Sequence, residues 1–587
     1  MKSALFLAKY LEYKGVDHVF ELIGGMITHI IDAIDTETNI KIISCHHEQS
    51  SGFAAEGYAR VKGIPGVALA TSGPGATNLI TSIGSCYFDS IPTIFITGQV
   101  NTYELKKDKN IRQLGFQETD IISIVEPICK SVFQVEKSQD LPEILENAFH
   151  IALQGRQGPC VIDIPMNIQS EIIRDGLVGK YLKTYSKLNF QNKKPSSEEN
   201  TTDLLDIKLN LLQEEISISK KPLLLAGGGC SNFHNRNSSK KIIEYLNLPV
   251  VNSLMGTDIL PYNHPLRVGF IGSYGNRWAN KLLADSDLLI TIGSRLDIRQ
   301  TGSDLNGFCN NKKIWQIDID ENEIGLRFSP TNSIKTSIVS FEKKIRNLSF
   351  KLNSNMENWS NKIQSLKNEY PSENEYKKIE NEINPIKLLK ELSCYNSKPK
   401  IYITDVGQHQ MWSAQSLQLK IKDRFITSGG MGAMGFGLPA AIGSFYGSQE
   451  EEILLISGDG SFQLNIQELE TVKRNNIPIK IILFNNYCHG MVRQFQDSYF
   501  KGNTQSTLKG YSAPDFVKIA KAYGIQAFNI LSFKNISKSL EFLFSTSDPV
   551  LLEIPLSRHS NVYPKMAFGR KFGDMEPEIK PTQMEST

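Results

Sequence analysis

Two apolar runs in the last third of the sequence end in small residues that carry oxygen atoms. The first, "LLISGDGSFQ" (454–463), contains Asp459 between two glycines, and the second, "IILFNNYCHGM" (481–491), reaches Asn486. A carboxylate and an amide oxygen at the tips of neighbouring strands suit a hard cation such as Mg²⁺, which keeps few protein ligands and shares the phosphates of its substrate. Either a nucleotide or a diphosphate cofactor could supply those phosphates.

This chemistry requires both runs to be strands of one parallel sheet, because ligands bind beyond the carboxyl ends of such strands. We expect the second strand at 477–484. Between the runs, Ile466, Leu469 and Val472 recur at helical spacing, with Ser461 placed to cap the helix. The N-terminus of that helix would favour an anion in the same crevice. Either motif alone is more simply a tight turn or a loop, and only the two together favour a site.

A second candidate group lies in "IISCHHEQSSGFAAEGYAR" (42–60). Glu48 follows an expected strand at 40–45 and begins a helix. Taken alone, it is a helix-terminal glutamate whose charge the helix dipole favours. Glu56 lies two turns later on the same helix, where it has either a functional role or the ordinary role of a solvated charge.

The elements that must position these groups show an α/β pattern. Nearly continuous apolar, β-branched runs alternate with helices throughout the sequence, which predicts parallel sheets covered on both faces. We therefore expect three doubly wound parallel-sheet domains and a short tail. The expected ranges are 1–180, 190–350, 370–560 and, for the tail, 561–587. A polar linker at 183–203 and a polar connector with helical periodicity at 353–385 separate the domains.

Composition narrows the class of function. The chain has 587 residues with 64 Lys and Arg against 62 Asp and Glu, so there is no electrostatic case for binding nucleic acid or an anionic membrane. Its eight cysteines have no metal-site spacing, which is typical of a reducing compartment. No run approaches the roughly 20 apolar residues of a membrane span, and the N-terminus is unlike a signal peptide. We expect small-molecule chemistry in the cytoplasm, with a cytosol-like organelle left open.

At this point the sequence resembles a known family. GDG followed by NN, with 24 residues between the two motifs, is similar to the signature of thiamine-diphosphate-dependent enzymes. The resemblance implies thiamine diphosphate as the cofactor, with Mg²⁺ bound by the side chains of Asp459 and Asn486 and the backbone carbonyl of Cys488. The residues it implies on the diphosphate side are Gly407, Gln408, His409, Gly458, Gly460, Ser461, His489, Gly490 and Met491.

The same resemblance extends to the first third of the chain. It implies that Glu48 hydrogen-bonds the cofactor's pyrimidine ring from a different domain, and that burial lets it share a proton with the ring. Segment 71–78 is similar to the family's Gly-rich loop over the pyrimidine; its implied contact residues are Thr71, Gly73, Pro74 and Asn78. In "ITSGGMGAMGFGLPAAIG" (426–443), Gly432 and Met434 resemble residues that support the bent cofactor.

Within this family, the sequence to about residue 560 resembles the catalytic subunit of acetolactate (acetohydroxyacid) synthase. "GFQETDI" (115–121) implies that Phe116 and Gln117 lie near the reacting carbon, together with Gly25. In the middle domain, Arg299 would face the substrate. The resemblance also implies FAD with a structural rather than redox role, for which the candidate residues are Gly228, Arg295 and Asp318. A Rossmann-like domain that has lost its ligand is the alternative.

The implied function is a carboligase that decarboxylates pyruvate and transfers the two-carbon unit to a second keto compound. Four departures leave the acceptor open: the longer segment 101–115, Ile298, Phe495 and the tail. The alternatives are a related carboligase that adds a two-carbon branch to a nucleotide-linked keto-sugar, and a pyruvate-oxidase-like flavoenzyme. The expected partners are small 2-keto acids and a second copy of the chain in a homodimer or homotetramer, without nucleic acid or membrane; a regulatory subunit is left open.

Overall fold

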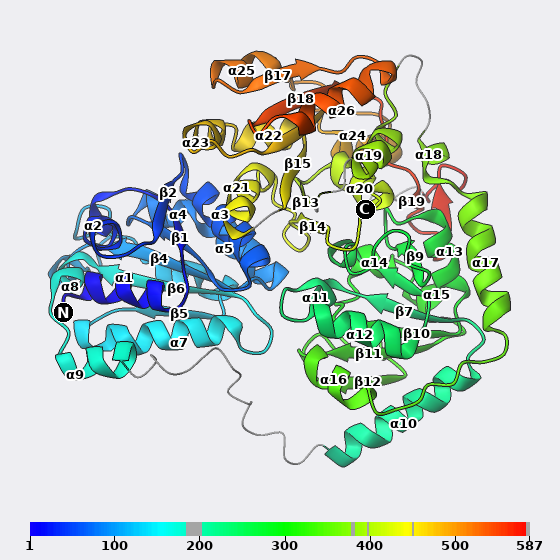
Figure 1. Cartoon of the computed structure of the whole chain (residues 1–587), viewed down its shortest axis with the longest axis horizontal. Helices are drawn as coiled ribbons and strands as arrows, with labels where there is room; N and C mark the ends of the chain where they lie inside the picture. The colour runs from blue at the N-terminus through cyan, green and yellow to red at the C-terminus, as the bar shows by residue number, and fades with distance from the viewer. Residues whose placement is uncertain are drawn as a thin grey trace.

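The computed structural model describes residues 1–107, 109–183, 202–376, 382–395, 398, 400–448 and 451–582. Within them, three six-stranded sheets follow one another along the chain (Figure 1). The first lies at the left of the view in blue and cyan, the second at the lower right in green, and the third at the top in yellow and orange. Neighbouring strands in each sheet pair in parallel. The predicted fold class of three doubly wound parallel sheets is confirmed.

The N-terminal sheet has the strand order β2-β1-β3-β4-β6-β5. Its strands are β1 (His18–Leu22), β2 (Lys41–Ser44), β3 (Gly66–Ala70), β4 (Thr93–Gln99), β5 (Ser131–Gln134) and β6 (Pro159–Pro165). Because successive side chains of a strand point to opposite faces, each face needs its own helical cover. One face carries α3 (Glu48–Lys62) and α5 (Ile80–Asp89); the other carries α1 (Ser3–Tyr13), α2 (Thr28–Glu37) and α7 (Leu141–Leu153).

The middle sheet has the order β12-β11-β10-β7-β8-β9. Its strands are β7 (Pro222–Ala226), β8 (Val250–Asn252), β9 (Arg267–Phe270), β10 (Leu288–Ile292), β11 (Lys313–Asp318) and β12 (Asn332–Lys335). Read from β9, this is the 3-2-1-4-5-6 order of dinucleotide-binding sheets. One face carries α10 (Thr202–Ile218), α12 (Arg236–Leu246) and α16 (Ile338–Ile345); the other carries α13 (Arg277–Asp285) and α17 (Met356–Glu369).

The C-terminal sheet has the order β14-β13-β15-β16-β18-β17, which repeats the topology of the N-terminal sheet. Its strands are β13 (Lys400–Thr404), β14 (Arg424–Thr427), β15 (Glu452–Gly458), β16 (Lys480–Asn485), β17 (Gln526–Asn529) and β18 (Val550–Pro555). One face carries α21 (Gly437–Gly447), α23 (Glu468–Arg474) and α25 (Phe516–Ala522); the other carries α19 (Pro385–Cys394), α20 (Gln408–Ser416) and α26 (Ile536–Ser545). Strand β16 begins three residues later than predicted.

Helix α3 of the N-terminal sheet packs directly on α21 of the C-terminal sheet, and the two sheets share one hydrophobic core. A Cβ atom on Gly443 would lie 1.7 Å from the carbonyl oxygen of Ala54, and one on Gly57 would lie 2.2 Å from that of Ala440. Glycine at both positions therefore lets the two backbones touch. Because α3 begins at Glu48, this contact sets where that residue lies relative to the C-terminal sheet.

Two predicted connecting segments have different outcomes. The linker at 183–203 lies mostly outside the described residues, and its last two residues already belong to α10. The connector at 353–385 contains α17 and the short α18 (Ser372–Glu375), so its helical periodicity is confirmed. The three sheets occupy 18–165, 222–335 and 400–555, whereas the exact domain boundaries stay predictions.

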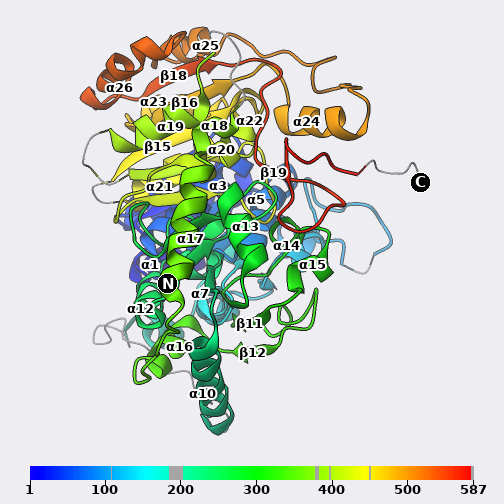
Figure 2. The ribbon, with the colours of Figure 1, turned by 90° about the vertical axis from the view of Figure 1, so that its right-hand side faces the viewer.

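The tail, whose order no sequence pattern predicted, forms a small hairpin of β19 (Lys565–Met566) and β20 (Met575–Glu576). It lies against the middle domain (Figure 2). There, Arg277 at the start of α13 donates to the backbone carbonyls of β20. In the described part of the chain, no helix is long and apolar enough to cross a membrane.

Candidate functional site

The C-terminal sheet changes direction between β13 and β15, because β13 connects outward to β14 and β15 connects outward to β16. Loops at the carboxyl ends of two such strands diverge and leave a crevice for a ligand. Gly407 follows β13, Asp459 follows β15 and Asn486 follows β16. The three segments that sequence patterns singled out therefore lie at one edge of one sheet.

Three oxygen atoms converge at this edge. Oδ1 of Asn486 lies 3.2 Å from Oδ1 of Asp459 and 2.8 Å from the carbonyl oxygen of Cys488. Oxygen ligands of Mg²⁺ lie about 2.1 Å from the ion at right angles, so adjacent ligands are about 3.0 Å apart. Both distances from Oδ1 of Asn486 match those between adjacent octahedral ligands, and the residues predicted to bind the metal fit Mg²⁺.

The orientation of the Asn486 amide decides whether this cluster needs a cation. Its Nδ2 donates to Oε1 of Gln408 at 2.7 Å, while Nε2 of Gln408 donates to the carbonyl oxygen of Ser560 at 2.8 Å. Exchanging the two amide atoms of Asn486 would let it donate to Asp459 and Cys488, but its oxygen would then face the oxygen of Gln408. Because Ser560 fixes Gln408, the present orientation is the consistent one, and a cation would relieve the facing oxygens.

The carboxylate of the cluster is held from its other side. Burial raises the pKa of Asp459 to about 6, although hydrogen bonds act in the opposite direction. The strongest of these comes from Tyr511, whose hydroxyl donates to Oδ2 of Asp459 at 2.9 Å. The Tyr511 ring packs on His489 at a centroid distance of 4.3 Å, and a Cβ atom on Gly460 would lie 2.8 Å from that histidine. Tyr511 therefore leaves Oδ1 to face the other two oxygens.

Small residues let the surrounding segments approach one another. A Cβ atom on Gly458 would lie 2.7 Å from Nδ1 of His409, and one on Gly490 would lie 2.2 Å from Oε1 of Gln408. Gly490 and Met491 begin α24 (Gly490–Tyr499). Burial lowers the pKa of His409 to about 3, so its ring is neutral at physiological pH. In the described residues its Nε2 has no hydrogen-bond partner, which leaves one polar atom available to a ligand.

The predicted capping role of Ser461 is wrong. Helix α22 (Asp459–Leu464) begins two residues earlier with Gly458 as its N-cap, and Oγ of Ser461 donates to the carbonyl oxygen of Val406 at 2.5 Å. The predicted single helix is also two helices, α22 and α23, because a turn at 465–467 separates them. Ser461 instead ties the loop after β15 to the loop after β13.

Asp405, which no sequence pattern singled out, holds the glycine-rich loop after β14. Its two carboxylate oxygens accept the backbone N–H groups of Gly435 and Gly437, each at 3.0 Å. Burial raises the pKa of Asp405 to about 6. Gly432 in this loop has a φ of 65° and borders open space, while Met434 is half-buried beside it. The loop is thus fixed at its C-terminal end and open in its middle.

Glu48 is a buried carboxylate at the edge of the N-terminal sheet. It follows β2 and begins α3, which His47 caps by accepting the N–H of Gln49 at 3.1 Å. Nδ2 of Asn78 donates to Oε2 of Glu48 at 2.9 Å, and a Cβ atom on Gly75 would lie 3.3 Å from Oε1. The carboxylate therefore lies beside the segment that follows β3, at the point where this sheet also reverses its strand order.

The predicted Gly-rich loop at 71–78 is only partly a loop, because α4 (Pro74–Asn78) occupies its second half. Before it, Gly73 has a φ of 61°, and a Cβ atom there would lie 3.0 Å from Cβ of Gln117. Gln117 itself has a φ of 65°, a costly conformation for a non-glycine residue that is typical of functional sites. The neighbouring Phe116 is 79% exposed.

Gly25 and Thr71 lie across the same reversal point, after β1 and β3. Oγ1 of Thr71 accepts the N–H of Met26 at 3.3 Å, and no atom lies within 4 Å of a Cβ built on Gly25. In the described residues, no hydrogen bond joins Glu48 to the oxygen cluster around Asp459. One chain therefore presents the residues predicted for the pyrimidine side and those predicted for the diphosphate side as two groups.

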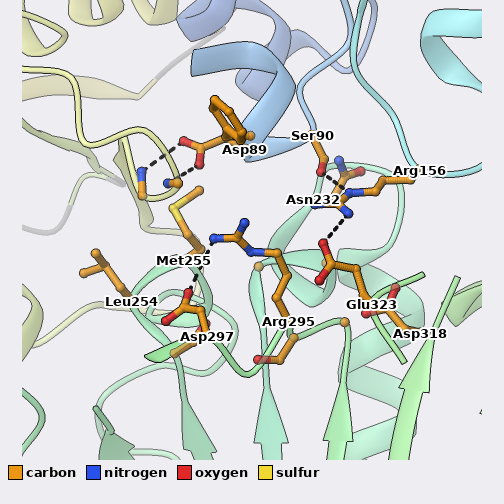
Figure 3. A pocket seen from close by; sticks show the side chains of 18 of the residues that line it. Asp89, Ser90, Arg156, Asn232, Leu254, Met255, Arg295, Asp297, Asp318 and Glu323 are labelled. Atoms are coloured by element: carbon orange, nitrogen blue, oxygen red, sulfur yellow. Dashed lines mark hydrogen bonds and ion pairs between the residues drawn. The ribbon is translucent and has the colours of Figure 1, made fainter. Parts of the chain in front are cut away.

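A cavity of about 550 Å³ lies between the three sheets (Figure 3). Its floor is the middle sheet at the reversal point between β7 and β10, the place where dinucleotides bind in this strand order. A Cβ atom on Gly227 would lie 2.1 Å from the carbonyl oxygen of Gly293, so glycine lets the two strand ends meet there. The predicted residues that line this cavity are Gly228, Arg295, Arg299 and Asp318.

The cavity walls combine charges of both signs. Arg295 projects into the space and pairs with Asp297, and Arg156 of the N-terminal domain reaches Glu323 of the middle domain at 2.6 Å (Figure 3). Arg156 also pairs with Asp320 at 2.9 Å. Volumes of 300–1,000 Å³ with a few convergent polar groups are typical of cofactor sites. The size, strand order and glycine cradle fit a dinucleotide such as FAD.

Comparison with known proteins agrees with this division into three parts. The sequence matches three family models, described as the N-terminal TPP binding domain (residues 1–124), the central domain (209–342) and the C-terminal TPP binding domain (405–554) of thiamine pyrophosphate enzymes. These segments contain Glu48, the predicted FAD residues and the oxygen cluster, respectively.

Curated relatives match over nearly the whole chain. Acetolactate synthase, chloroplastic, of Arabidopsis thaliana is 35% identical over 587 residues, which cover 98% of this chain and 84% of that protein. The acetolactate synthase large subunit of Pyropia yezoensis is 35% identical, covering 97% and 94%. That of Lactococcus lactis subsp. lactis is 34% identical, covering 96% and 94%.

Proposed function

Because the chain belongs to the thiamine pyrophosphate enzyme family, we propose that it is a thiamine-diphosphate-dependent carboligase of the acetolactate synthase type. It decarboxylates pyruvate and joins the two-carbon unit to a second keto compound. The observation that carries this assignment is the cluster of three facing oxygen atoms from Asp459, Asn486 and Cys488, which fits a Mg²⁺ ion that holds a diphosphate.

Thiamine diphosphate supplies a carbon nucleophile and an electron sink for decarboxylation. The chain's own contribution is to hold it and to move protons. Asp459, Asn486 and Cys488 bind the cation, and His409 offers its free Nε2 to the diphosphate side. Glu48 would contact the pyrimidine side, where Asn78 orients its carboxyl group through Oε2 and leaves Oε1 for the ring. Gln117, held in its strained conformation against Gly73, lies at the substrate side.

The central cavity holds FAD in a structural role. Support comes from the strand order of the middle sheet, the Gly227–Gly293 contact at its reversal point, and the cavity that these strands form with the other two domains. Arg156 closes the cavity wall between the N-terminal and middle domains through its ion pairs with Asp320 and Glu323. Flavin release is therefore expected to be slow.

The assembly is a homodimer or homotetramer in the cytoplasm. Oligomerisation is supported by large apolar side chains that lie next to the proposed site residues and are exposed in the single chain, because exposed apolar patches mark protein–protein interfaces. They are Ile23 (55%), Phe116 (79%), Met431 (41%) and Leu464 (53%). A second copy that covers them would also bring the Glu48 group of one chain to the oxygen cluster of the other.

The acceptor is pyruvate or another small 2-keto acid. Incubation of the purified protein with pyruvate, thiamine diphosphate and Mg²⁺, followed by product mass, tests this directly. Acetolactate with release of carbon dioxide is the expected result. Peroxide formation with flavin turnover would show an oxidase instead, and product only when a nucleotide-linked keto-sugar is added would show the other carboligase.

Variants test the two residue groups separately. Glu48→Gln should keep Mg²⁺-dependent binding of the cofactor but lose most turnover, whereas Asp459→Ala should lose the bound cofactor on gel filtration. Glu143→Gln is the matched control, because Glu143 is also a first-turn glutamate, in α7, but is exposed. Near-normal decarboxylation by Glu48→Gln would contradict the proposed role of Glu48.

A further inference from the structure

One loop connects the central cavity to the cofactor edge of the C-terminal sheet. At its start, Gly429 and Gly430 line the cavity. At its end, Gly435 and Gly437 donate their N–H groups to Asp405 at the diphosphate edge. Because this loop has one end in each site, ordering one end can affect ligand binding at the other. This requires a contact that holds the cavity end of the loop in a defined position.

Asp89, the last residue of α5, is that contact. Its Oδ2 accepts the N–H of Gly429 at 3.0 Å and its Oδ1 accepts that of Gly430 at 2.6 Å, and both bonds are visible at the cavity wall in Figure 3. The Asp89 side chain is only 2% exposed. Met255 also packs here: a Cβ atom on Gly429 would lie 2.5 Å from its sulfur. Both side chains form part of the cavity wall.

Behind Asp89 lies a buried pair of charges on α3. Arg60 donates to Asp89 at 2.6 Å and to Glu56 at 3.1 and 2.5 Å. Glu56 is fully buried, so the solvated alternative left open by the sequence is wrong. Although burial acts to lower it, the pKa of Arg60 is raised by the two carboxylates, so the guanidinium stays charged. Buried charges of this kind are costly, and one role that retains them is to fix a specific geometry.

We propose that Asp89 is a positioning residue that couples the central cavity to the thiamine cofactor: a dinucleotide in the cavity packs on Asp89 and Met255, fixes the start of loop 429–437, and so preorganises the loop for the cofactor. This rests on the proposed function, in which the cavity holds FAD and the loop contacts thiamine diphosphate. Arg60 and Glu56 give the same aspartate a rigid link to the helix that begins at Glu48.

The two sites are coupled because a ligand in the cavity reduces the conformational freedom of loop 429–437, without any direct contact between the two ligands. Gly429 and Gly430 border the cavity on the side away from Asp89, and glycine-rich backbone loses much entropy when it is fixed. When the first ligand orders the loop, the second ligand binds a loop that is already ordered and loses less conformational entropy. The two ligands then bind with positive cooperativity. Because coupling free energies are reciprocal, each cofactor must tighten the other by the same factor, roughly 5- to 150-fold in known cases.

The test measures the dissociation constant of thiamine diphosphate at saturating Mg²⁺ by calorimetry, with the wild-type apoprotein, in the presence and absence of FAD. At least fivefold tighter binding with FAD is expected, together with an equal effect of thiamine diphosphate on FAD affinity. In Asp89→Asn the ratio should fall below twofold. Asp304→Asn is the control: Asp304 also accepts a glycine N–H, that of Gly307 at 2.9 Å, but it does not line the cavity, so the wild-type ratio should be kept.

A second measurement does not depend on the variant folding. In hydrogen exchange of the wild type, FAD alone should slow exchange of the peptide that contains residues 428–437. A wild-type ratio of one, an unchanged ratio in Asp89→Asn, or no protection of that peptide by FAD would each overturn the proposal. Failure of the wild type to bind thiamine diphosphate at all would instead refute the proposed function.

Discussion

The contact between α3 and α21 makes a strong prediction for Gly443→Ala. A Cβ atom at this position would lie 1.7 Å from the carbonyl oxygen of Ala54, about half the 3.4 Å at which ordinary contact begins. Both partners are backbone atoms of helices inside the core shared by two sheets, so no side chain can swing aside. The helices must therefore separate by roughly 1.5 to 2 Å.

The cost of that separation can be estimated from two effects. Overpacking a close-packed core costs about 1–3 kcal/mol, and a displacement of this size lies at or above the upper end. In catalysis, a misplacement of about 1 Å can cost roughly 10²-fold. Because α3 begins at Glu48, Gly443→Ala should lower the unfolding temperature by several degrees and reduce turnover by at least about 100-fold, while Mg²⁺-dependent cofactor binding changes less.

Two further variants calibrate the result. Gly57→Ala, whose Cβ atom would lie 2.2 Å from the carbonyl oxygen of Ala440, should show a smaller loss of both quantities. Gly176→Ala is the control, because no atom lies within 4 Å of its Cβ and its backbone conformation is ordinary. Thermal unfolding and acetolactate formation from pyruvate are the measurements. Wild-type values for both in Gly443→Ala would refute the claim that this contact positions Glu48.

Three other predictions concern buried carboxylates and their partners. Burial raises the pKa of Asp163 to about 7, so the protonated carboxyl group stabilises the folded state. This stabilisation is fully present below about pH 4, near the pKa of the unfolded chain, and is lost as the pH rises through about 7. Urea unfolding of the wild type should lose about 2 kcal/mol between about pH 5.5 and 7.5, and Asp163→Asn should remove this dependence. Although burial acts to raise it, two arginine partners hold the pKa of Asp258 at about 2. Asp258→Ala should cost about 3–5 kcal/mol in the same assay, because both arginine side chains, only 12% and 16% exposed, lose their carboxylate partner. Tyr511→Phe should weaken Mg²⁺ about tenfold and Ca²⁺ less, since a freed Oδ2 of Asp459 suits the bidentate carboxylates that Ca²⁺ accepts; equal loss for both ions in a cofactor-binding titration would contradict this.

The strands and the proximity of Asp459 to Asn486 could be predicted from the sequence for a simple physical reason. Strands buried on both faces are continuous apolar runs, and the carboxyl ends of parallel strands lie at one edge, so residues just after two such runs must lie close together. The start of α3 at Glu48 was equally accessible, because a strand and a glycine-rich apolar helix bound it on either side.

Contacts that depend on docking between segments could not be predicted in this way. Tyr511 reaches Asp459 from a position 52 residues downstream, and nothing in its local sequence marks it. Asp89 looks like an ordinary helix end until the fold brings Gly429 and Gly430 to it. Ser461 was misassigned because a serine before a periodic run favours a cap, whereas here a tertiary hydrogen bond competes for its hydroxyl.

The three sheets show why docking decides the function. Each reverses its strand order beside its first strand, and each places its candidate residues at or next to that reversal: Glu48 and Thr71 in the first, the cavity floor in the second, the oxygen cluster in the third. Any one sheet offers only an open crevice, and the N-terminal and C-terminal sheets even share one topology although we propose that they hold opposite ends of the cofactor. The chemistry is therefore set less by the fold of a domain than by the few contacts that join domains, among them Gly443 against Ala54 and Asp89 against its loop. Substitutions at these contacts between domains should change activity more than substitutions of equal volume inside any single sheet.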